Sequence, residues 1–167
     1  KISIVPHGIT QLEKIARPKL SKKFRVGFLG NATVRKGIFV FLEAVKKLHN
    51  QDFEFEVFGI SSPEIKTKCS ELKVNIRGGY KTQQLPKLLH NIDLVLIASV
   101  VDETFSLTLS EALAMGIPVL TSDAGALKER IEEGRNGFLF RTGDSSHLVE
   151  KLLFIKDNPQ LLKDVQT

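Results

Sequence analysis

Apolar runs of strand length alternate with stretches of helical periodicity along most of this sequence. Residues 24–30 read as a buried strand, and residues 37–49 place apolar side chains on one face of a helix. Residues 53–58 alternate with a period of two, as a strand does, and residues 93–98 are apolar almost throughout. An almost continuous apolar run such as residues 93–98 is typical of a central strand that is covered on both faces. The alternation therefore predicts an α/β fold with a parallel sheet.

The whole pattern predicts a Rossmann-like, doubly wound parallel β-sheet of about six strands with helices on both faces. The expected strands are 24–30, 53–58, 73–77, 93–98, 118–120 and 138–140, and the expected helices are 37–49, 63–72, 82–90, 106–115, 127–133 and 145–156. Thr82 and Asp144 are the expected N-caps of two of these helices. In such sheets ligands bind beyond the carboxyl ends of the strands, near the point where the strand order reverses.

The chain of 167 residues has the length of one domain. Residues 1–22 read as an interdomain linker segment, because one strand-like stretch is followed by Pro6-His7-Gly8 and then by a basic piece. Residues 23–167 are expected to form the domain itself. Since the chain begins at Lys1, within a strand-like stretch, we expect it to be a piece of a longer protein.

The formal net charge of +5 is compatible with phosphate-bearing ligands, nucleic acid or anionic lipid. The lysines and arginines are scattered, Trp is absent and there is one Tyr. Nucleic-acid binding needs clustered cations with interleaved aromatic residues, so we expect no nucleic-acid partner. The one cysteine, Cys69, excludes an internal disulfide, and the four histidines lack the spacing of metal ligands.

The loop after the first predicted strand, residues 30–37, reads Gly-Asn-Ala-Thr-Val-Arg-Lys-Gly. It leads into a predicted helix, whose first backbone N–H groups attract anions, and Arg35 and Lys36 add two positive charges. We interpret the loop as a pyrophosphate site that uses Lys36 with help from Arg35. It has neither the Gly-Lys-Ser/Thr of a Walker loop nor the G-x-G-x-x-G of a dinucleotide fold. A plain connecting turn with surface charges is the alternative.

Two carboxylates, Glu103 and Glu111, stand eight residues apart. Glu103 lies in the loop after the predicted strand 93–98, and Glu111 lies inside the next helix, so we expect them at different depths of one crevice. Carboxylates accept hydrogen bonds from hydroxyl groups, as an acidic residue does from ribose in dinucleotide-binding folds. The spacing suits a ligand with hydroxyl, phosphate and hydroxyl groups in line. The alternative for Glu111 is an ordinary position on a helix surface.

The segment from Glu103 to Val119 resembles the E-x7-E signature of the group 1 (family 4) glycosyltransferases. Four further elements resemble motifs of that family in the family's order: Val5-Pro6-His7-Gly8 its interdomain Pro-Asn-Gly segment, residues 30–37 its G-R-x-x-x-x-K-G loop, Gly125-Ala126 with Glu129 its Gly-Gly-x-x-E element, and residues 134–139 its G-x-N-G-x-L element. The resemblance covers nearly the whole chain. It implies the C-terminal, donor-binding domain of a retaining glycosyltransferase with the GT-B fold.

The resemblance also implies roles for individual residues. Lys36 corresponds to the lysine that binds the donor diphosphate, Glu103 to the glutamate that holds hydroxyls of the transferred sugar, and Glu111 to the glutamate that binds the nucleotide ribose. Lys36 and Glu103 are thus the expected catalytic residues. The family arginine falls on Asn31, and Arg35 is the candidate to supply the missing charge. The other expected donor-binding residues are Gly30, Thr104, Phe105, Ser106, Leu107, Thr108, Tyr80 and Lys81, with Thr104 and Ser106 standing where the family has glycines.

The implied reaction is transfer of a sugar from a nucleoside diphosphate sugar to an acceptor with retention of configuration. No metal or other cofactor is expected, because cationic side chains take the place of the metal. The acceptor would bind an N-terminal domain absent from this chain, so we expect this piece to bind the donor and transfer almost nothing. Acceptors in this family are often membrane-associated glycolipids of bacterial polysaccharide or lipopolysaccharide synthesis, which implies a cytoplasmic protein, peripheral at the inner face of the membrane. A sugar-nucleotide epimerase of the same architecture and a binding module without catalysis are the alternatives.

Overall fold

The computed structural model describes residues 12–16 and 22–164. Within them the chain forms a six-stranded parallel sheet with the order β3-β2-β1-β4-β5-β6. The strands are β1 (Phe24–Leu29), β2 (Phe53–Phe58), β3 (Asn75–Gly78), β4 (Leu94–Ile97), β5 (Val119–Ser122) and β6 (Phe138–Phe140). The helices are α1 (Ile38–Lys47), α2 (Pro63–Glu71), the 3-10 helix η1 (Thr82–Gln84), α3 (Leu85–Leu89), α4 (Leu107–Ala114), α5 (Ala126–Arg130), α6 (Ser145–Asp157) and α7 (Gln160–Asp164). The predicted fold class is confirmed.

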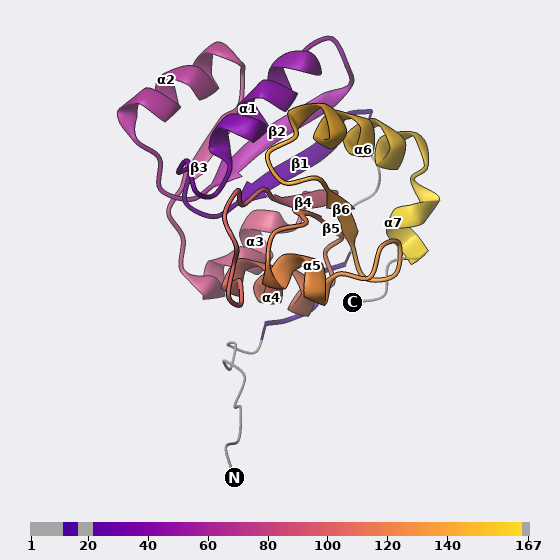
Figure 1. The fold of residues 1–167 in the computed structure, drawn as a ribbon. Helices are drawn as coiled ribbons and strands as arrows, with labels where there is room; N and C mark the ends of the chain where they lie inside the picture. The colour runs from indigo at the N-terminus through magenta and orange to yellow at the C-terminus, as the bar shows by residue number, and fades with distance from the viewer. Residues whose placement is uncertain (1–11, 17–21, 165–167) are drawn as a thin grey trace.

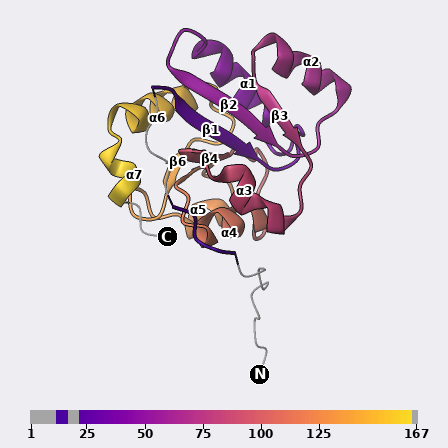
Figure 2. The same ribbon diagram turned by 180° about the vertical axis from the view of Figure 1, so that it is seen from behind.

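Helices cover both faces of the sheet. Helices α1, α2 and α6 lie on one face, and α3, α4 and α5 lie on the other (Figure 1 and Figure 2). One hydrophobic cluster fills the space under the first group and includes the buried Phe28, Phe41 and Leu152. A second cluster joins the sheet to the other group through Leu85, Leu109 and Leu127. This burial of both faces explains why the four residues of β4 are apolar and buried.

The strand order reverses between β1 and β4. From β1 the chain winds outward through β2 to the edge strand β3, and then it returns to β4 on the other side of β1. The loops that follow β1 and β4 therefore leave the same edge of the sheet toward helices on opposite faces. In doubly wound sheets this is the place where a crevice forms and ligands bind.

Side chains and special backbone positions fix the helix ends. Helix α2 starts with Pro63, which lacks a backbone N–H at a position where that group has no partner within the helix. The hydroxyl of Ser62, the residue before it, accepts a hydrogen bond from the backbone N–H of Ile65 at 3.4 Å. Asp144 accepts two backbone N–H bonds at the start of α6, as predicted. Strand β3 begins later than the predicted residue 73, because Lys73 has a φ of 56° and turns the chain after α2.

The prediction that Thr82 caps a helix over residues 82–90 is wrong. That segment is divided into η1 and α3, and the residue before η1 is Lys81, whose backbone N–H donates to Oε1 of Gln84 at 2.8 Å. The hydroxyl of Thr82 instead donates to Oε1 of Glu111 at 2.7 Å. A carboxylate within reach is a stronger partner for a hydroxyl than a backbone group, and it draws the side chain away from the helix end.

Residues 12–16 lie against the domain. The backbone N–H of Ile15 donates to the carbonyl oxygen of Met115 at 3.1 Å, and Leu12 and Ile15 pack against the second hydrophobic cluster. Residues 1–11 and 17–21, and with them Val5-Pro6-His7-Gly8, lie outside the described residues. The role of residues 1–22 as an interdomain linker stays a prediction.

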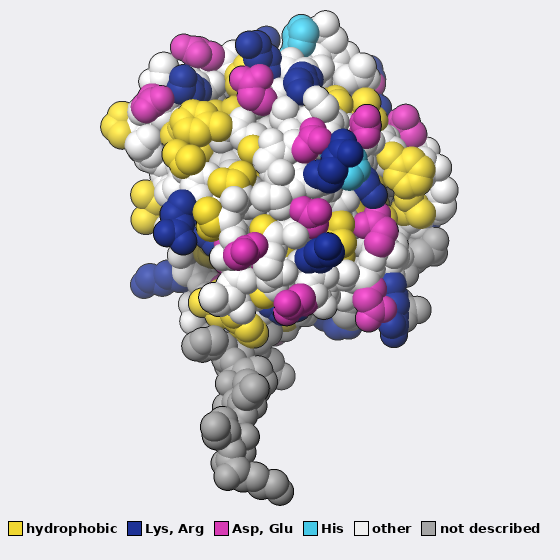
Figure 3. Space-filling view, in the orientation of Figure 1, with side chains coloured by type: hydrophobic (Ala, Val, Ile, Leu, Met, Phe, Trp, Pro, Cys, Tyr) yellow, Lys and Arg dark blue, Asp and Glu magenta, His cyan; other side chains and the backbone are white. Residues whose placement is uncertain are grey.

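Charges of both signs are mixed over the face of the molecule that Figure 3 shows. In Figure 3 the Lys and Arg side chains alternate with Asp and Glu over the visible face, and apolar side chains appear in separate patches. In the part of the chain that the structure describes, no helix is both long and apolar enough to span a membrane.

Candidate functional site

The loops that follow β1 and β4 are joined at the carboxyl edge of the sheet. The backbone N–H of Val100 donates to the carbonyl oxygen of Arg35 at 2.9 Å. Gly37 ends the first loop with a φ of 76°, and a Cβ atom on it would lie 1.8 Å from the carbonyl oxygen of Ala98. Only a residue without a side chain lets the two backbones approach this closely. The loops therefore form one unit at the point where the strand order reverses.

Lys36 and Glu103 meet across these two loops. Nζ of Lys36 donates to Oε1 of Glu103 at 2.5 Å, and the hydroxyl of Ser99 donates to the same oxygen at 2.5 Å. Burial opposes ionisation of Glu103, but the bonds from Lys36 and Ser99 outweigh it, and the pKa of the Glu103 carboxyl lies below its ordinary value. Glu103 is therefore an anion that is held in place by two donors.

Ser99 connects this carboxylate to the sheet. It is fully buried, and its carbonyl oxygen accepts a hydrogen bond from the hydroxyl of Ser122, the last residue of β5, at 2.6 Å. Two adjacent strands thus fix the position of Glu103. The sequence offers one signal for Ser99, which is its place four residues before Glu103 at the end of a predicted central strand, and it offers none for Ser122.

A cavity of about 200 Å³ lies beside the ion pair. It is lined by Arg35, Lys36, Val101, Asp102, Glu103 and Thr104. Arg35 is exposed, and its positive charge contributes to the lowered pKa of Glu103. A small open cavity with two cations and the carboxylates of Asp102 and Glu103 at its wall can hold a group that combines negative charge with hydroxyls.

The loop continues from this cavity into α4. Ser106 is the N-cap of α4, and its hydroxyl accepts a bond from the backbone N–H of Leu109 at 3.4 Å and lies 3.1 Å from Oγ1 of Thr108. A Cβ atom on Gly30 would lie 4.0 Å from Cγ2 of Thr108, so the start of α4 faces the loop after β1. The positive end of this helix dipole therefore adds to the charges of Arg35 and Lys36.

Glu111 lies one turn further along α4, and 8% of its surface is exposed. Its Oε1 accepts the hydroxyl of Thr82 at 2.7 Å. Burial raises the pKa of the Glu111 carboxyl, and the bond from Thr82 offsets part of that rise. Burial and the nearby charge of Glu111 in turn raise the pKa of Tyr80. Thr82 thus contacts the predicted site residue Glu111, although the sequence presents Thr82 only as a helix cap.

The structure places the predicted residues in two groups along this edge. Arg35, Lys36, Glu103 and Thr104 surround the cavity, with Gly30, Ser106 and Thr108 next to them, whereas Glu111 and Tyr80 belong with Thr82. Glu111 does not line the cavity beside Glu103, so the crevice expected to contain both carboxylates is not a single cavity in the described part of the chain.

Three predicted residues have other surroundings. Oδ1 of Asn31 accepts the backbone N–H of Ile60 at 3.1 Å, which ties the loop after β1 to the end of β2. Lys81 is exposed, and its backbone N–H is bonded to Gln84. Leu107, the first residue of α4, has 57% of its surface exposed. Among the described residues, no cluster of three or more His, Cys, Asp or Glu side chains could hold a metal ion.

A family model described as "Glycosyl transferases group 1" matches residues 23–158, a span that includes every residue named at this edge. The chain belongs to the group 1 glycosyltransferases. The sequence-based assignment to this family is therefore confirmed, and the strand order and loop unit described above are those of a glycosyltransferase domain.

This glycosyltransferase domain is similar to several known proteins. It is 28% identical to the amylovoran biosynthesis glycosyltransferase AmsK of Erwinia amylovora, over 92% of this chain and 41% of AmsK. It is 27% identical to the phosphatidyl-myo-inositol mannosyltransferase of Mycobacterium leprae, over 94% of this chain and 45% of that protein. The structure of HepE from Anabaena in complex with UDP-glucose matches 84% of this chain and 41% of HepE, with a TM-score of 0.73 and 25% identity. The chain spans less than half the length of these relatives.

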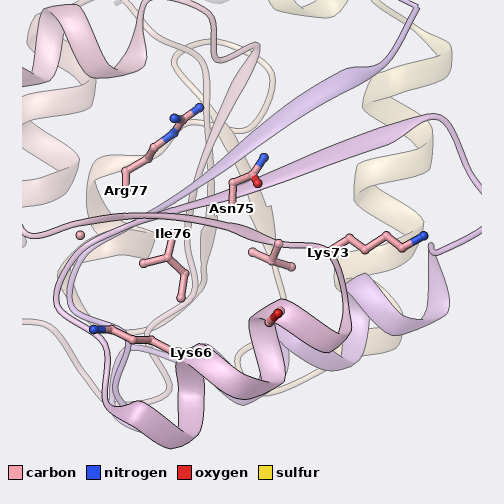
Figure 4. A pocket seen from close by; sticks show the side chains of 8 residues that line it. Lys66, Lys73, Asn75, Ile76 and Arg77 are labelled. Atoms are coloured by element: carbon pink, nitrogen blue, oxygen red, sulfur yellow. The ribbon is translucent and has the colours of Figure 1, made fainter.

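A larger hollow of about 660 Å³ lies elsewhere in this glycosyltransferase domain, between α2 and the edge strand β3. Its lining includes Lys66, Lys73 and Arg77, but Figure 4 shows Ile76 pointing toward the helix that carries Lys66 while Asn75 and Arg77 extend away from that helix. Arg77 is paired with Glu56 at 2.6 Å. These cations do not converge on one point, and charged side chains on an edge strand serve to prevent pairing with another sheet.

Proposed function

We propose that this chain is the donor-binding half of a retaining glycosyltransferase that takes a sugar from a nucleoside diphosphate sugar without a metal ion. The observation that carries the proposal is the contact between Lys36 and Glu103 beside the start of α4, at the reversal point of the sheet. Family membership and the presence of UDP-glucose in the structure of HepE support it.

In the proposed mechanism Lys36 and Arg35 stabilise the negative charge that develops on the leaving diphosphate. The N–H groups at the start of α4, over Phe105, Ser106 and Leu107, contribute in the same direction, and the hydroxyl of Thr108 adds a donor. These groups would make a metal ion unnecessary. The carboxylate of Glu103 accepts hydrogen bonds from hydroxyls of the sugar and so fixes the ring for attack at the anomeric carbon.

In the proposed mechanism, the ion pair gives Lys36 and Glu103 a charged partner before the donor binds. A partly buried carboxylate and a neighbouring ammonium stabilise each other, whereas either one alone would lose hydration without gaining a partner. A donor that places its phosphate against Lys36 and its sugar hydroxyls against Glu103 would replace this pair with equivalent charge-assisted bonds. The site thus exchanges one set of partners for another rather than desolvating bare charges.

Glu111 is proposed to bind the ribose hydroxyls, with Tyr80 and Lys81 near the base. Thr82 holds the Glu111 carboxylate at 2.7 Å and so fixes its direction. The acceptor would bind an N-terminal domain of the same protein. We also propose a membrane-associated acceptor and a cytoplasmic, peripheral location, with support from the similarity to the phosphatidyl-myo-inositol mannosyltransferase, whose name includes a lipid. Family membership favours transfer over the epimerase and over a binding module without catalysis.

Thermal denaturation with UDP, GDP and ADP and their glucose or mannose derivatives tests the proposal. A ligand that binds only the folded chain stabilises it by about 2.7 kcal/mol at a hundredfold excess over Kd, which corresponds to a rise in Tm of about 5 to 10 °C for a domain of this size. We expect one base to give a clear shift without added metal. No shift with any nucleotide at millimolar concentration contradicts the proposal.

Glu103→Gln and Glu111→Gln should affect ligands differently. Loss of the charge on Glu103 removes charge-assisted bonds to the sugar, so the Kd of the nucleotide sugar should rise about tenfold while that of the bare diphosphate stays within about twofold. Glu111→Gln should weaken both ligands by about tenfold, since both carry the ribose. Isothermal titration calorimetry with the preferred diphosphate and its sugar measures these changes.

Glu43→Gln is the matched control, because Glu43 is exposed on α1, beyond the end of the loop after β1, and does not line the cavity at the ion pair. It should leave both affinities unchanged. If Glu103→Gln weakens the bare diphosphate as much as the nucleotide sugar, Glu103 does not have the sugar-binding role that we assign to it.

A further inference from the structure

Ser106 has an unusual backbone conformation for a residue with a side chain. Its φ is 60°, and it stands directly before α4, where the loop from Glu103 enters the helix. A non-glycine residue in this region costs about 1 to 2 kcal/mol, and it persists only where its surroundings hold it. The start of α4 is therefore held by contacts that offset this strain.

Arg130, the last residue of α5, supplies those contacts. Its Nη1 donates to the carbonyl oxygen of Phe105 at 2.5 Å and to that of Ser106 at 3.3 Å, and its Nη2 donates to the hydroxyl of Ser110 at 2.8 Å. Its guanidinium also lies 4.8 Å from the centre of the Phe105 ring. One side chain thus contacts both residues of the bend and the first turn of the helix.

The hydrogen-bond acceptors that Arg130 contacts, two carbonyl oxygens and one hydroxyl, are all uncharged. No carboxylate lies within ion-pair distance of it among the described residues, although burial lowers its pKa and so opposes its charge. A cation near the N-terminus of a helix also opposes the helix dipole. Both unfavourable effects would be offset if an anion binds at the same helix end.

We propose that Arg130 is a positioning residue for donor binding, which fixes the strained bend at Phe105 and Ser106 and so presents the start of α4 to the diphosphate. The inference rests on the proposed function, because it takes the diphosphate as the ligand of α4. Arg130 touches the backbone that holds the donor, and it acts through that backbone.

The test compares Arg130→Met, Arg130→Lys, Ser106→Gly and the double variant Arg130→Met with Ser106→Gly. Arg130→Met should raise the Kd of the preferred nucleoside diphosphate about tenfold, because the bend is released and the positive potential falls. Arg130→Lys should show an intermediate loss, since Lys can reach one carbonyl but not three acceptors. Ser106→Gly added to Arg130→Met should recover much of the affinity, because glycine adopts this φ freely and is tolerated at an N-cap.

Amide hydrogen exchange of the ligand-free chain provides a readout that does not depend on the ligand. Exchange over residues 104–110 should become about tenfold faster in Arg130→Met than in the original chain, with the rest of the sheet unchanged, and slower again in the double variant. Arg135→Met is the control, because Arg135 is exposed and paired only with Glu132 among the described residues.

The outcomes separate the two proposals. If no nucleotide binds the original chain, the proposed function fails, and the exchange data show whether Arg130 holds the bend. If Arg130→Met changes exchange uniformly over the domain, or if the nucleotide affinity of the folded variant equals that of the original chain, Arg130 is only a structural residue and the inference is overturned. The inference is also overturned if the double variant recovers neither the nucleotide affinity nor the slower amide exchange over residues 104–110.

Discussion

Gly37→Ala should lower the free energy of unfolding by about 3 kcal/mol or prevent folding altogether. The new Cβ would lie 1.8 Å from the carbonyl oxygen of Ala98 and 2.7 Å from its carbon, both of which are backbone atoms that cannot rotate away. The loops after β1 and β4 would have to separate, and the Lys36 to Glu103 contact would be lost with them. Urea denaturation followed by circular dichroism measures the loss.

Gly143→Ala is the control that distinguishes the energetic cost of the steric clash at Gly37 from the cost of backbone strain. Gly143 has a φ of 77°, nearly the same as the 76° of Gly37, but a Cβ atom there meets nothing within 4 Å. Its substitution should therefore cost only the strain, about 1 kcal/mol. Equal destabilisation by the two substitutions would mean that the close approach of the two loops is not what requires Gly37.

Lys36→Met should weaken binding of the preferred nucleoside diphosphate about 30- to 100-fold, equivalent to about 2 to 3 kcal/mol. The ammonium group is the cation nearest to Glu103, and a charge-assisted bond to phosphate is among the strongest that a side chain makes. Because Glu103 would lose its partner, its negative charge would also repel the diphosphate. Isothermal titration calorimetry at constant ionic strength measures the affinity.

Lys66→Met is the control for Lys36→Met. Lys66 lines the hollow at the β3 edge and carries the same charge, so its loss changes the net charge equally without touching the proposed site. Its nucleotide affinity should stay within about twofold of that of the original chain. Similar losses in the two variants would indicate a general charge effect, and the specific role of Lys36 would not stand.

The fold could be predicted because local signals and burial agree along the chain. Pro63 and Asp144 stand where helices begin, and residues 93–98 have the apolar composition that a strand covered on both faces requires. The site residues Lys36 and Glu103 could be proposed from the resemblance to the family motifs and from their places after two predicted strands, because the carboxyl ends of parallel strands share one edge of the sheet. Their direct contact depends on the strand order, which places β1 beside β4.

Other parts of the site depend on contacts between distant segments, which no local pattern reveals. Thr82 looks like a helix cap, yet it bonds to Glu111, 29 residues away. Arg130 bonds to the backbone of Phe105, 25 residues before it, and the strained φ of Ser106 appears only with coordinates. Asn31 stands where the related family has an arginine, and its side chain oxygen bridges to Ile60. The roles of Thr82, Arg130 and Ser106 follow from the packing of η1, α4 and α5 against the sheet, and that of Asn31 follows from the pairing of β1 with β2.

The crystal structure of this chain bound to its preferred nucleoside diphosphate sugar tests the account most directly. We predict a phosphate oxygen within about 3 Å of Nζ of Lys36, the ribose hydroxyls at Glu111 and the sugar hydroxyls at Glu103. A donor bound elsewhere, for example in the hollow beside β3, with Lys36 and Glu103 still paired and free of contact with it, would contradict the account.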